Sequence, residues 1–306
     1  MAKYPIGKLI ASTRNKYKIS QEALCYGICS ISTLSRIENG TQFPSWKVGN
    51  ALLERLGLSQ IDTAIYMSDT EIERDNIEIK ITRMLATGNY EIEDVLTQYW
   101  DEKSEISILE QQFYYCAVGI VKHYREKNLE EALQILQKAI RLTMPDFSVN
   151  QLDNIKLLTF DEITILNNIA TITYLLGDTS HGKKLMFFLK EHFEKINMDE
   201  EEKAKKYPMI LFNLSNWLLD DERFEEAVSL CDLGIDYCIT QGKLTLFPFL
   251  LCNKGNALAE QQKREEAREM FLESYYVFRA SKEVEKAEQV KQSVKELFDL
   301  ELGENL

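Results

Sequence analysis

The first sixty residues carry apolar positions at helical spacing that predict four short helices. Residues 6–17 form the first amphipathic stretch. Serines at Ser20 and Ser30 precede the second and third stretches, where a hydroxyl caps a helix N-terminus. The Pro-Ser pair at residues 44–45 opens the fourth. A tight turn around Gly27 separates the second and third helices, which is the arrangement of a helix-turn-helix.

Beyond residue 110 the pattern becomes a repeat. Segments beginning at residues 128, 223 and 263 end in Glu-Glu-Ala, and a degenerate copy begins at residue 178. The small residues that close these segments are Ala132, Gly182, Ala227 and Ala267. Twelve positions upstream lie Ile120, Ala170, Ser215 and Gly255, of which three are small. Antiparallel helices that cross closely need small residues at the crossing. The sequence therefore predicts helical hairpins starting near residues 113, 163, 208 and 248.

Polar residues recur at two equivalent positions of the first helix in these hairpins. The later three hairpins carry Asn168, Asn213 and Asn253 at one position and Thr171, Asn216 and Asn256 at the other. Asparagine is a poor residue for a helix interior, so its repetition needs a reason. Side-chain amides can both donate to and accept from the backbone of an extended peptide. Hydrogen bonds between helices and simple solvation are the structural alternatives.

We call these six residues, Asn168, Thr171, Asn213, Asn216, Asn253 and Asn256, the amide ladder. Aromatic side chains accompany it. We expect Tyr174, Phe212 and Phe249 to line pockets for peptide side chains, with ordinary packing inside the repeat as the alternative. The amide ladder and these aromatics together form the candidate peptide-binding set.

Composition favours a soluble helical protein. The chain is 45% hydrophobic and has only 13 Gly and 5 Pro in 306 residues, which suits an all-α fold. It contains no apolar run long enough for a membrane span and no apolar signal segment at its N-terminus. The sequence therefore predicts a cytoplasmic protein without a membrane partner.

Charge divides the chain into two parts. The net charge is −13, yet residues 1–60 hold eight Lys/Arg against three acidic residues and carry +5. The remaining residues carry −18. A basic head on an acidic body indicates two domains with different partners.

Enzyme and metal signatures are missing from the sequence. The six cysteines are scattered without zinc spacing, and the three histidines lie in unrelated contexts. Phosphate-binding, dinucleotide and zinc-protease motifs are also absent. We therefore expect no catalytic residue, no metal site and no cofactor.

The predicted third helix offers the residue types that read DNA. We expect DNA contacts from residues on exposed helix ends or faces: Gln21, Ser30, Ser32, Thr33 and Arg36. Gln21 and Ser30 lie at helix N-termini, which favour phosphate. Arg36 can reach the major-groove edge of guanine. The alternative for Arg36 is a surface ion pair with Glu38 or Glu22.

These motifs resemble known families. Residues 19–24, 30–40 and 44–45 resemble the lambda-repressor-like (XRE) helix-turn-helix, although the turn at residues 27–29 is one residue longer than in the shortest phage repressors. That difference affects the orientation of the third helix relative to the second. The repeats resemble tetratricopeptide (TPR) units, with periods of 40–50 residues rather than the usual 34. A concave face lined by the first helices is the implied binding surface.

The combination is similar to the RRNPP family of peptide-pheromone receptors from Gram-positive bacteria. The resemblance implies a DNA-binding domain at residues 1–66 and a TPR-like peptide-binding and dimerisation domain at residues 67–306. It also implies a cytoplasmic transcriptional regulator, controlled by a short signalling peptide, which binds a palindromic double-stranded DNA operator as a homodimer. Residues 58–69 would connect the domains, and an amphipathic helix at residues 71–84 would transmit peptide binding to the head.

Two alternative functions remain open at this point. The body could dock a partner protein, so that the chain would be a TPR interaction scaffold recruited to DNA by its head. Alternatively, the chain could resemble the phosphatase-type members of the same wider family, although their amino-terminal helical bundle is replaced here by a DNA-binding head.

Overall fold

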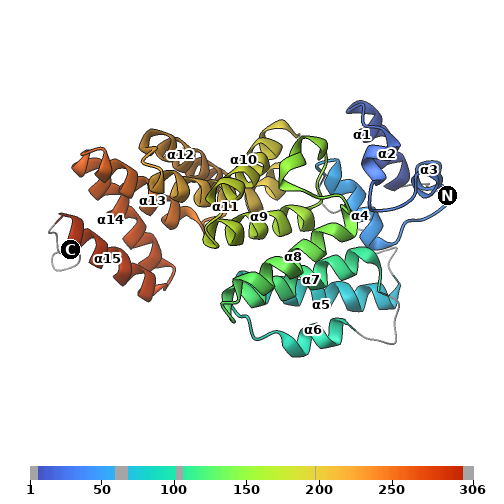
Figure 1. Cartoon of the computed structure of the whole chain (residues 1–306), viewed down its shortest axis with the longest axis horizontal. Helices are drawn as coiled ribbons and strands as arrows, with labels where there is room; N and C mark the ends of the chain where they lie inside the picture. The colour runs from blue at the N-terminus through green and yellow to red at the C-terminus, as the bar shows by residue number, and fades with distance from the viewer. Residues whose placement is uncertain (1–5, 59–67, 101–105, 197, 299–306) are drawn as a thin grey trace. The chain divides into compact units, whose positions relative to one another are not determined.

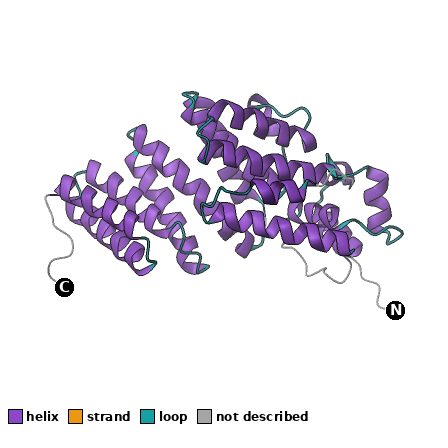
Figure 2. Cartoon of the chain, turned by 90° about the horizontal axis from the view of Figure 1, so that it is seen from below, coloured by secondary structure: helices purple, strands orange, loops and turns teal. Residues whose placement is uncertain are grey.

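The computed structural model describes residues 6–58, 68–100, 106–196 and 198–298. Every regular element within these ranges is a helix (Figure 2), which confirms the predicted all-α class. The chain forms two compact units: unit 1 contains residues 1–189 and 194–199, and unit 2 contains residues 190–193 and 200–306. The expected domain boundary after residue 66 and most of the expected connecting segment lie outside the described residues.

The head consists of four helices at the amino-terminal end of unit 1 (Figure 1). They are α1 (Ile6–Lys16), α2 (Gln21–Cys25), α3 (Ile31–Glu38) and α4 (Trp46–Arg55). The hydroxyls of Ser20, Ser30 and Ser45 each accept a hydrogen bond from a backbone N–H in the first turn, as the sequence predicts. Gly27 and Gly40 take positive φ values of 69° and 71° at the ends of α2 and α3.

One apolar stripe from each of these helices forms the core of the head. Its most buried side chains belong to Ile10, Leu24, Leu34, Ile37, Leu52 and Leu53. Because all four helices contribute to this core, the head packs as a helix-turn-helix module. Leu157, from the segment that precedes residue 160, also packs against it.

The rest of unit 1 is a series of helices that pack on their neighbours. They are α5 (Asp69–Ala86), α6 (Glu93–Tyr99), α7 (Ile108–Tyr124), α8 (Leu129–Thr143), a 3₁₀ turn at Val149–Asn154, α9 (Phe160–Leu175) and α10 (Thr179–Lys195). Part of α10, residues 190–193, belongs to unit 2. Helices α5, α7 and α9 begin with capping boxes, in which a Ser or Thr and a Glu three residues later satisfy each other's backbone N–H.

Unit 2 continues the repeat with two helical hairpins and a final helix. Its helices are α11 (Glu200–Asp220), α12 (Phe224–Thr240), α13 (Phe247–Glu260), α14 (Arg264–Ala280) and α15 (Val284–Phe298). Consecutive helices contact each other, and α11 also contacts α13. These hairpins, together with α7–α8 in unit 1, confirm a TPR-like architecture.

Small residues lie at the helix crossings that the sequence predicts. Ala132, Ala227 and Ala267 are fully buried on the second helices. On the first helix of the α13–α14 hairpin, a Cβ added at Gly255 would come within 3.0 Å of the Phe271 ring. The first hairpin differs by one residue. There Gly119, rather than the expected position 120, makes the close approach.

Candidate functional site

Helix α3 has one apolar face and one polar face. Leu34 and Ile37 are 0% and 1% exposed and belong to the core of the head. Ser32 and Arg36 are exposed, and Thr33 is half-buried. The face outside the core therefore carries short hydroxyls and a guanidinium, which are groups that recognise base edges in a major groove.

Three hydroxyls gather at the N-terminus of α3. The Ser30 Oγ accepts from the Thr33 backbone N–H at 3.0 Å. It also lies 2.9 Å from the Ser32 Oγ and 2.8 Å from the Thr33 Oγ1. The helix dipole is positive at this end and its first N–H groups point outward. The arrangement suits a phosphate group or another anion.

Glu38 ties three helices of the head together. Its carboxylate accepts from the Arg14 guanidinium at 2.6 and 2.9 Å and from the Gln21 Nε2 at 2.7 Å. Burial opposes its charge, but these hydrogen bonds outweigh burial and hold the pKa of Glu38 below its usual value. Glu38 is therefore engaged by Arg14, and Arg36 forms no ion pair with any residue in the described ranges. Gln21, a candidate DNA contact, also fixes α2 against α3.

The carboxyl end of α4 anchors the head to α9. Arg55 donates to the Glu162 carboxylate at 2.9 Å, and the two side chains are 1% and 0% exposed. Arg55 also donates to the backbone carbonyls of Leu24 and Tyr26 at the end of α2. The neighbouring Glu54 accepts from the Phe160 backbone N–H at 2.9 Å. Sequence reasoning missed this anchor, because 107 residues separate the two partners and no local pattern marks them.

The turn between α2 and α3 contacts the carboxyl end of α8. A Cβ at Gly27 would come within 1.9 Å of the Thr143 carbonyl oxygen. The Thr143 hydroxyl donates to Glu162 at 2.6 Å and accepts from the Gln112 Nε2 at 2.7 Å. Thr143 therefore contacts both the turn of the head and the ion pair that anchors it. The glycine is required here by close approach as well as by its positive φ.

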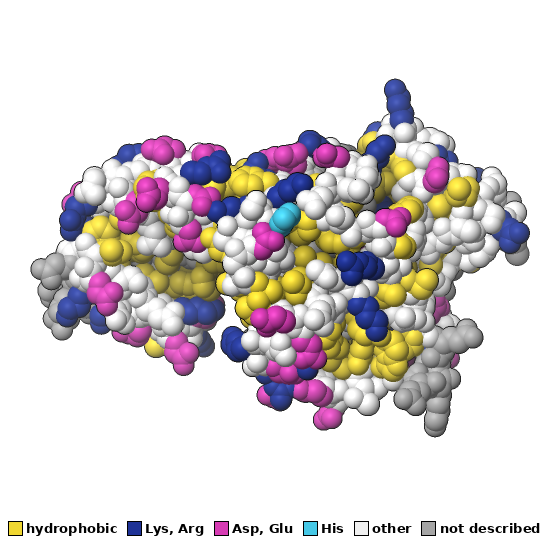
Figure 3. All heavy atoms as spheres, viewed as in Figure 1, with side chains coloured by type: hydrophobic (Ala, Val, Ile, Leu, Met, Phe, Trp, Pro, Cys, Tyr) yellow, Lys and Arg dark blue, Asp and Glu magenta, His cyan; other side chains and the backbone are white. Residues whose placement is uncertain are grey.

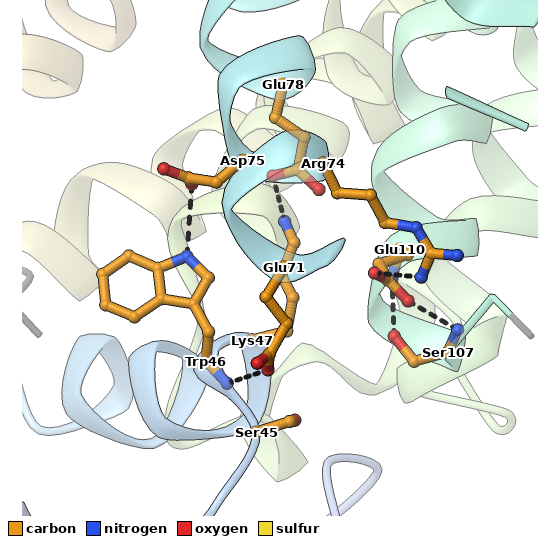
Figure 4. Close-up of a pocket in the computed structure, with 9 residues that line it drawn as sticks. All are labelled: Ser45, Trp46, Lys47, Glu71, Arg74, Asp75, Glu78, Ser107 and Glu110. Atoms are coloured by element: carbon orange, nitrogen blue, oxygen red, sulfur yellow. Dashed lines mark hydrogen bonds and ion pairs between the residues drawn. The ribbon is translucent and has the colours of Figure 1, made fainter. Parts of the chain in front are cut away.

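The amino end of α4 packs on α5 around a small polar cavity (Figure 4). The cavity has a volume of about 170 Å³. Trp46 donates through its backbone N–H to Glu71 at 3.0 Å and through its indole N–H to Asp75 at 3.2 Å. Lys47 pairs with Glu78. Figure 4 shows these side chains pointing toward one another across the α4–α5 boundary.

In this cavity, ion pairing and burial have opposite effects on the pKa of Lys47. Burial disfavours the charged form of Lys47, but the adjacent Glu78 carboxylate outweighs burial and raises the pKa of Lys47. On the α7 side of the cavity, Glu110 accepts from Arg74 at 2.8 Å and from the Ser107 backbone N–H at 2.7 Å. The carboxylates that line the cavity are thus engaged in holding α4, α5 and α7 together. No group of acidic, Cys and His residues suited to a metal ion occurs in the described ranges.

Helix α9 carries the part of the amide ladder that lies in unit 1. Asn168 is 6% exposed, and its Nδ2 donates to the Thr164 carbonyl at 2.9 Å. Thr171 is half-buried and donates to the Asn167 carbonyl at 2.9 Å. Tyr174 is half-buried one turn further along α9. The hydroxyl of Thr171 and one amide hydrogen of Asn168 are therefore used within the helix.

Helices α11 and α13 carry the ladder of unit 2. Asn216 is exposed, and Asn213 and Asn256 are half-buried. Asn253 is 5% exposed, and its Nδ2 donates to the Ser215 Oγ at 2.9 Å and to the Phe212 carbonyl at 3.2 Å. The amide hydrogens of Asn253 thus bridge α13 to α11, which is the inter-helix role that the sequence left open.

Half-buried aromatic rings lie beside this ladder. The Phe212 and Phe249 ring centroids are 5.8 Å apart in an edge-to-face arrangement. Phe249 makes a second such contact with Phe278 at 5.0 Å. Packing in the repeat therefore uses part of each ring.

Comparison with known proteins finds similar solved structures but no match by sequence. No protein-family model matches the chain, and no curated protein matches it by sequence. Among solved structures, the chain is similar to PlcR of Bacillus thuringiensis in complex with the peptide PapR7 and DNA. The TM-score is 0.62 at 20% identity, over 94% of this chain and 99% of that one. The chain has the fold of PlcR.

A second regulator gives a consistent comparison. The apo form of the competence regulator ComR from Streptococcus vestibularis matches with a TM-score of 0.51 at 18% identity, over 96% of this chain and 98% of that one. Apo PlcR matches with a TM-score of 0.57. The resemblance to the RRNPP family that the sequence indicates is therefore confirmed for the fold, along nearly the whole chain. Within the described ranges, no helix is both long and apolar enough to cross a membrane.

Proposed function

We propose that this protein is a sequence-specific DNA-binding transcriptional regulator whose activity is controlled by a short signalling peptide, as in quorum sensing. The observation that carries the proposal is the shared fold with PlcR, whose structure was determined with both a peptide and DNA bound. The polar face of α3 supports the DNA half, because it combines Ser32, Thr33 and Arg36 on a helix capped by Ser30.

The DNA-binding unit in this proposal is the head, residues 1–66. Residues 1–60 of the head carry +5, which favours the phosphate backbone, whereas the −18 of residues 61–306 disfavours it. Gln21 and Ser30 position the head on phosphates, and Arg36 reads a base edge. One small head reads few base pairs, so two heads of a homodimer on a palindromic operator would double the contacts.

The peptide-binding region in this proposal lies in residues 67–306. The exposed and half-buried amides of α11 and α13 support it, because they offer donors and acceptors beside the apolar rings of Phe212 and Phe249. On α9, Asn168, Thr171 and Tyr174 form the corresponding set. Asn253 contributes by holding α13 against α11, with its carbonyl oxygen as the group that accepts from the peptide.

The DNA half is tested by selecting bound duplexes from a random-sequence DNA library with the full-length protein. Enrichment of one motif with two-fold symmetry is the expected result. An unenriched library would contradict sequence-specific DNA binding. Binding to the selected duplex should also weaken steeply with salt, because phosphate contacts release counterions.

The peptide half is tested with a synthetic library of short apolar peptides and isothermal titration calorimetry. At least one peptide should bind and change the affinity for the selected duplex. If no peptide binds but a folded partner protein is retained by the body, the scaffold alternative replaces this half of the proposal. A short open reading frame beside the gene, encoding a secreted peptide, would supply the first sequence to synthesise.

A further inference from the structure

The first residue of α3 is a large apolar side chain that the core of the head leaves in solvent. Helix α3 carries three such side chains, at Ile31, Leu34 and Ile37. Leu34 and Ile37 are buried in the core, whereas Ile31 is 49% exposed. Ile31 belongs neither to that core nor to the half-buried residues that surround it. Figure 3 shows that hydrophobic side chains reach the surface of the head among polar and basic ones.

Ile31 lies at the edge of the polar face of α3. At about 100° per residue, Ile31 and Ser35 lie on the same side of the helix, and Ser32 lies about 60° beyond Ser35. Ser32 and Arg36 are exposed on that face. The isoleucine therefore borders the same surface that offers hydroxyls and a guanidinium.

The neighbours of Ile31 in the chain are suited to contacts with DNA. Ser30 caps α3, and its Oγ lies 2.9 Å from the Ser32 Oγ. The first turn of a recognition helix is the part that contacts base edges in the major groove. Ile31 thus lies between a residue assigned to phosphate and a residue assigned to base edges.

We propose that Ile31 recognises the C5-methyl group of a thymine in the operator. The thymine methyl is the apolar group that base pairs present in the major groove. An isoleucine side chain makes apolar contact with this methyl and offers no hydrogen bond to the donors and acceptors of guanine, adenine or cytosine. This inference rests on the proposed DNA-binding function and deepens it, because it names the base that one residue reads.

Thr33 carries another methyl group near the start of α3. Its side chain is half-buried, and its Oγ1 lies 2.8 Å from the Ser30 Oγ. Ile31 is more exposed, is larger and has no polar atom in its side chain. We therefore assign the methyl contact to Ile31 rather than to Thr33.

DNA binding supplies the burial that Ile31 lacks in the free protein. A single exposed isoleucine is common on protein surfaces. At this position, however, docking of α3 in a major groove removes both the isoleucine and the thymine methyl from water, which is favourable in proportion to the apolar area. Loss of one methyl-sized contact corresponds to about a fourfold loss of affinity.

Deoxyuridine tests this contact, because it keeps the base-pairing edge of thymidine and lacks only the C5-methyl group. Each thymine of the duplex selected with the full-length protein is replaced in turn by uracil, and affinity is measured by fluorescence anisotropy. For the wild-type protein, replacement at one operator position should weaken binding about fourfold. Ile31→Ser should bind the thymine and uracil duplexes equally at that position. A repeated library selection with Ile31→Ser should lose the thymine preference there.

Two further variants make the result specific. Ile31→Val keeps a branched apolar side chain and should retain the loss on uracil replacement. Ile239→Ser, at a 58% exposed isoleucine on α12, is the matched control and should bind every duplex like the wild type. Circular dichroism melting checks that every variant is folded.

The inference is overturned if no uracil replacement weakens binding by the wild-type protein, or if Ile31→Ser shows the wild-type loss at every thymine. It is also overturned if the selected motif contains no thymine. In these three cases the protein still selects one DNA motif, so the DNA half of the proposed function stands. An unenriched library would instead overturn both, since no base would then be read.

Discussion

Arg55 of α4 and Glu162 of α9 form an ion pair of 2.9 Å in which both side chains are almost completely buried. Glu162 is also the capping-box residue of α9, where it accepts from the Thr159 backbone N–H at 2.7 Å. The same carboxylate therefore sets the start of a body helix and holds the last turn of the head. Helix α9 also carries Asn168 and Thr171, so it links the head with part of the candidate peptide-binding set.

Removing one partner of this pair should strongly destabilise the protein. Glu162→Gln leaves the Arg55 guanidinium buried without a counter-charge, which costs about 3–5 kcal/mol. The double variant Arg55→Met/Glu162→Gln should lose much less than the sum of the two single variants, because no uncompensated charge remains. Urea unfolding measures these differences. Additive losses would show that the two side chains do not stabilise each other.

Gly27 and Gly40 form a matched pair for testing the contact between the head and α8. Gly40→Ala adds a Cβ in open space at a positive φ and should cost about 1 kcal/mol. Gly27→Ala adds the same strain and also meets the Thr143 carbonyl, so it should cost about 3 kcal/mol or more. Thermal unfolding of both variants checks the order. Equal losses of stability in the two variants would mean that the turn at Gly27 is not in close contact with α8.

Arg36→Ala should weaken binding to the selected operator by about 1–3 kcal/mol, the scale of a lost bidentate base contact. The sequence preference at one operator position should relax at the same time. Stability should hardly change, because Arg36 is exposed. Lys184→Ala, at an exposed position on α10, is the control. A footprint of Arg36→Ala with unchanged sequence preference would refute this assignment.

Substitutions in the amide ladder should affect the response to a peptide but not the binding of DNA. Asn213→Ala and Asn253→Ala should abolish the response to a peptide while DNA binding by the apo protein survives. Asn253→Ala should in addition cost about 1–3 kcal/mol of stability, since it removes the bonds to Ser215 and Phe212. Calorimetry with the peptide selected above measures the response. Gln134→Ala, at an exposed position on α8, serves as the control.

His192 should make unit 2 sensitive to acid. Burial lowers the pKa of His192 to about 4, whereas the unfolded chain has a pKa near 6.5. Between these values the unfolded state binds an additional proton, so stability falls as the pH falls. The loss should reach about 3 kcal/mol at pH 4 and be absent above pH 7. His192→Phe should remove this part of the pH dependence in urea unfolding, and an unchanged slope would contradict the assignment.

Local chemistry was sufficient to predict the elements of the head. Ser20, Ser30 and Ser45 cap helices as expected, because capping involves a side chain and a backbone N–H only three residues away. The inward positions of Leu34 and Ile37 also follow from helical periodicity alone. In the body, the repeated small residues marked the helix crossings, since each close crossing needs the same lack of side-chain volume.

Contacts between distant segments could not be predicted in the same way. Whether Arg55 meets Glu162, and whether the turn at Gly27 rests on Thr143, depends on how the head packs against helices more than a hundred residues further along the chain. A single pair of buried polar residues produces no repeating pattern in a sequence. The sequence likewise identified Asn253 as unusual but left its role open, because an amide can bond to a ligand or to a neighbouring helix. Thus the sequence by itself determined the helices, their inward faces and the repeat. Only the tertiary structure decided which polar groups are used in holding helices together, because that depends on which groups meet where water is excluded.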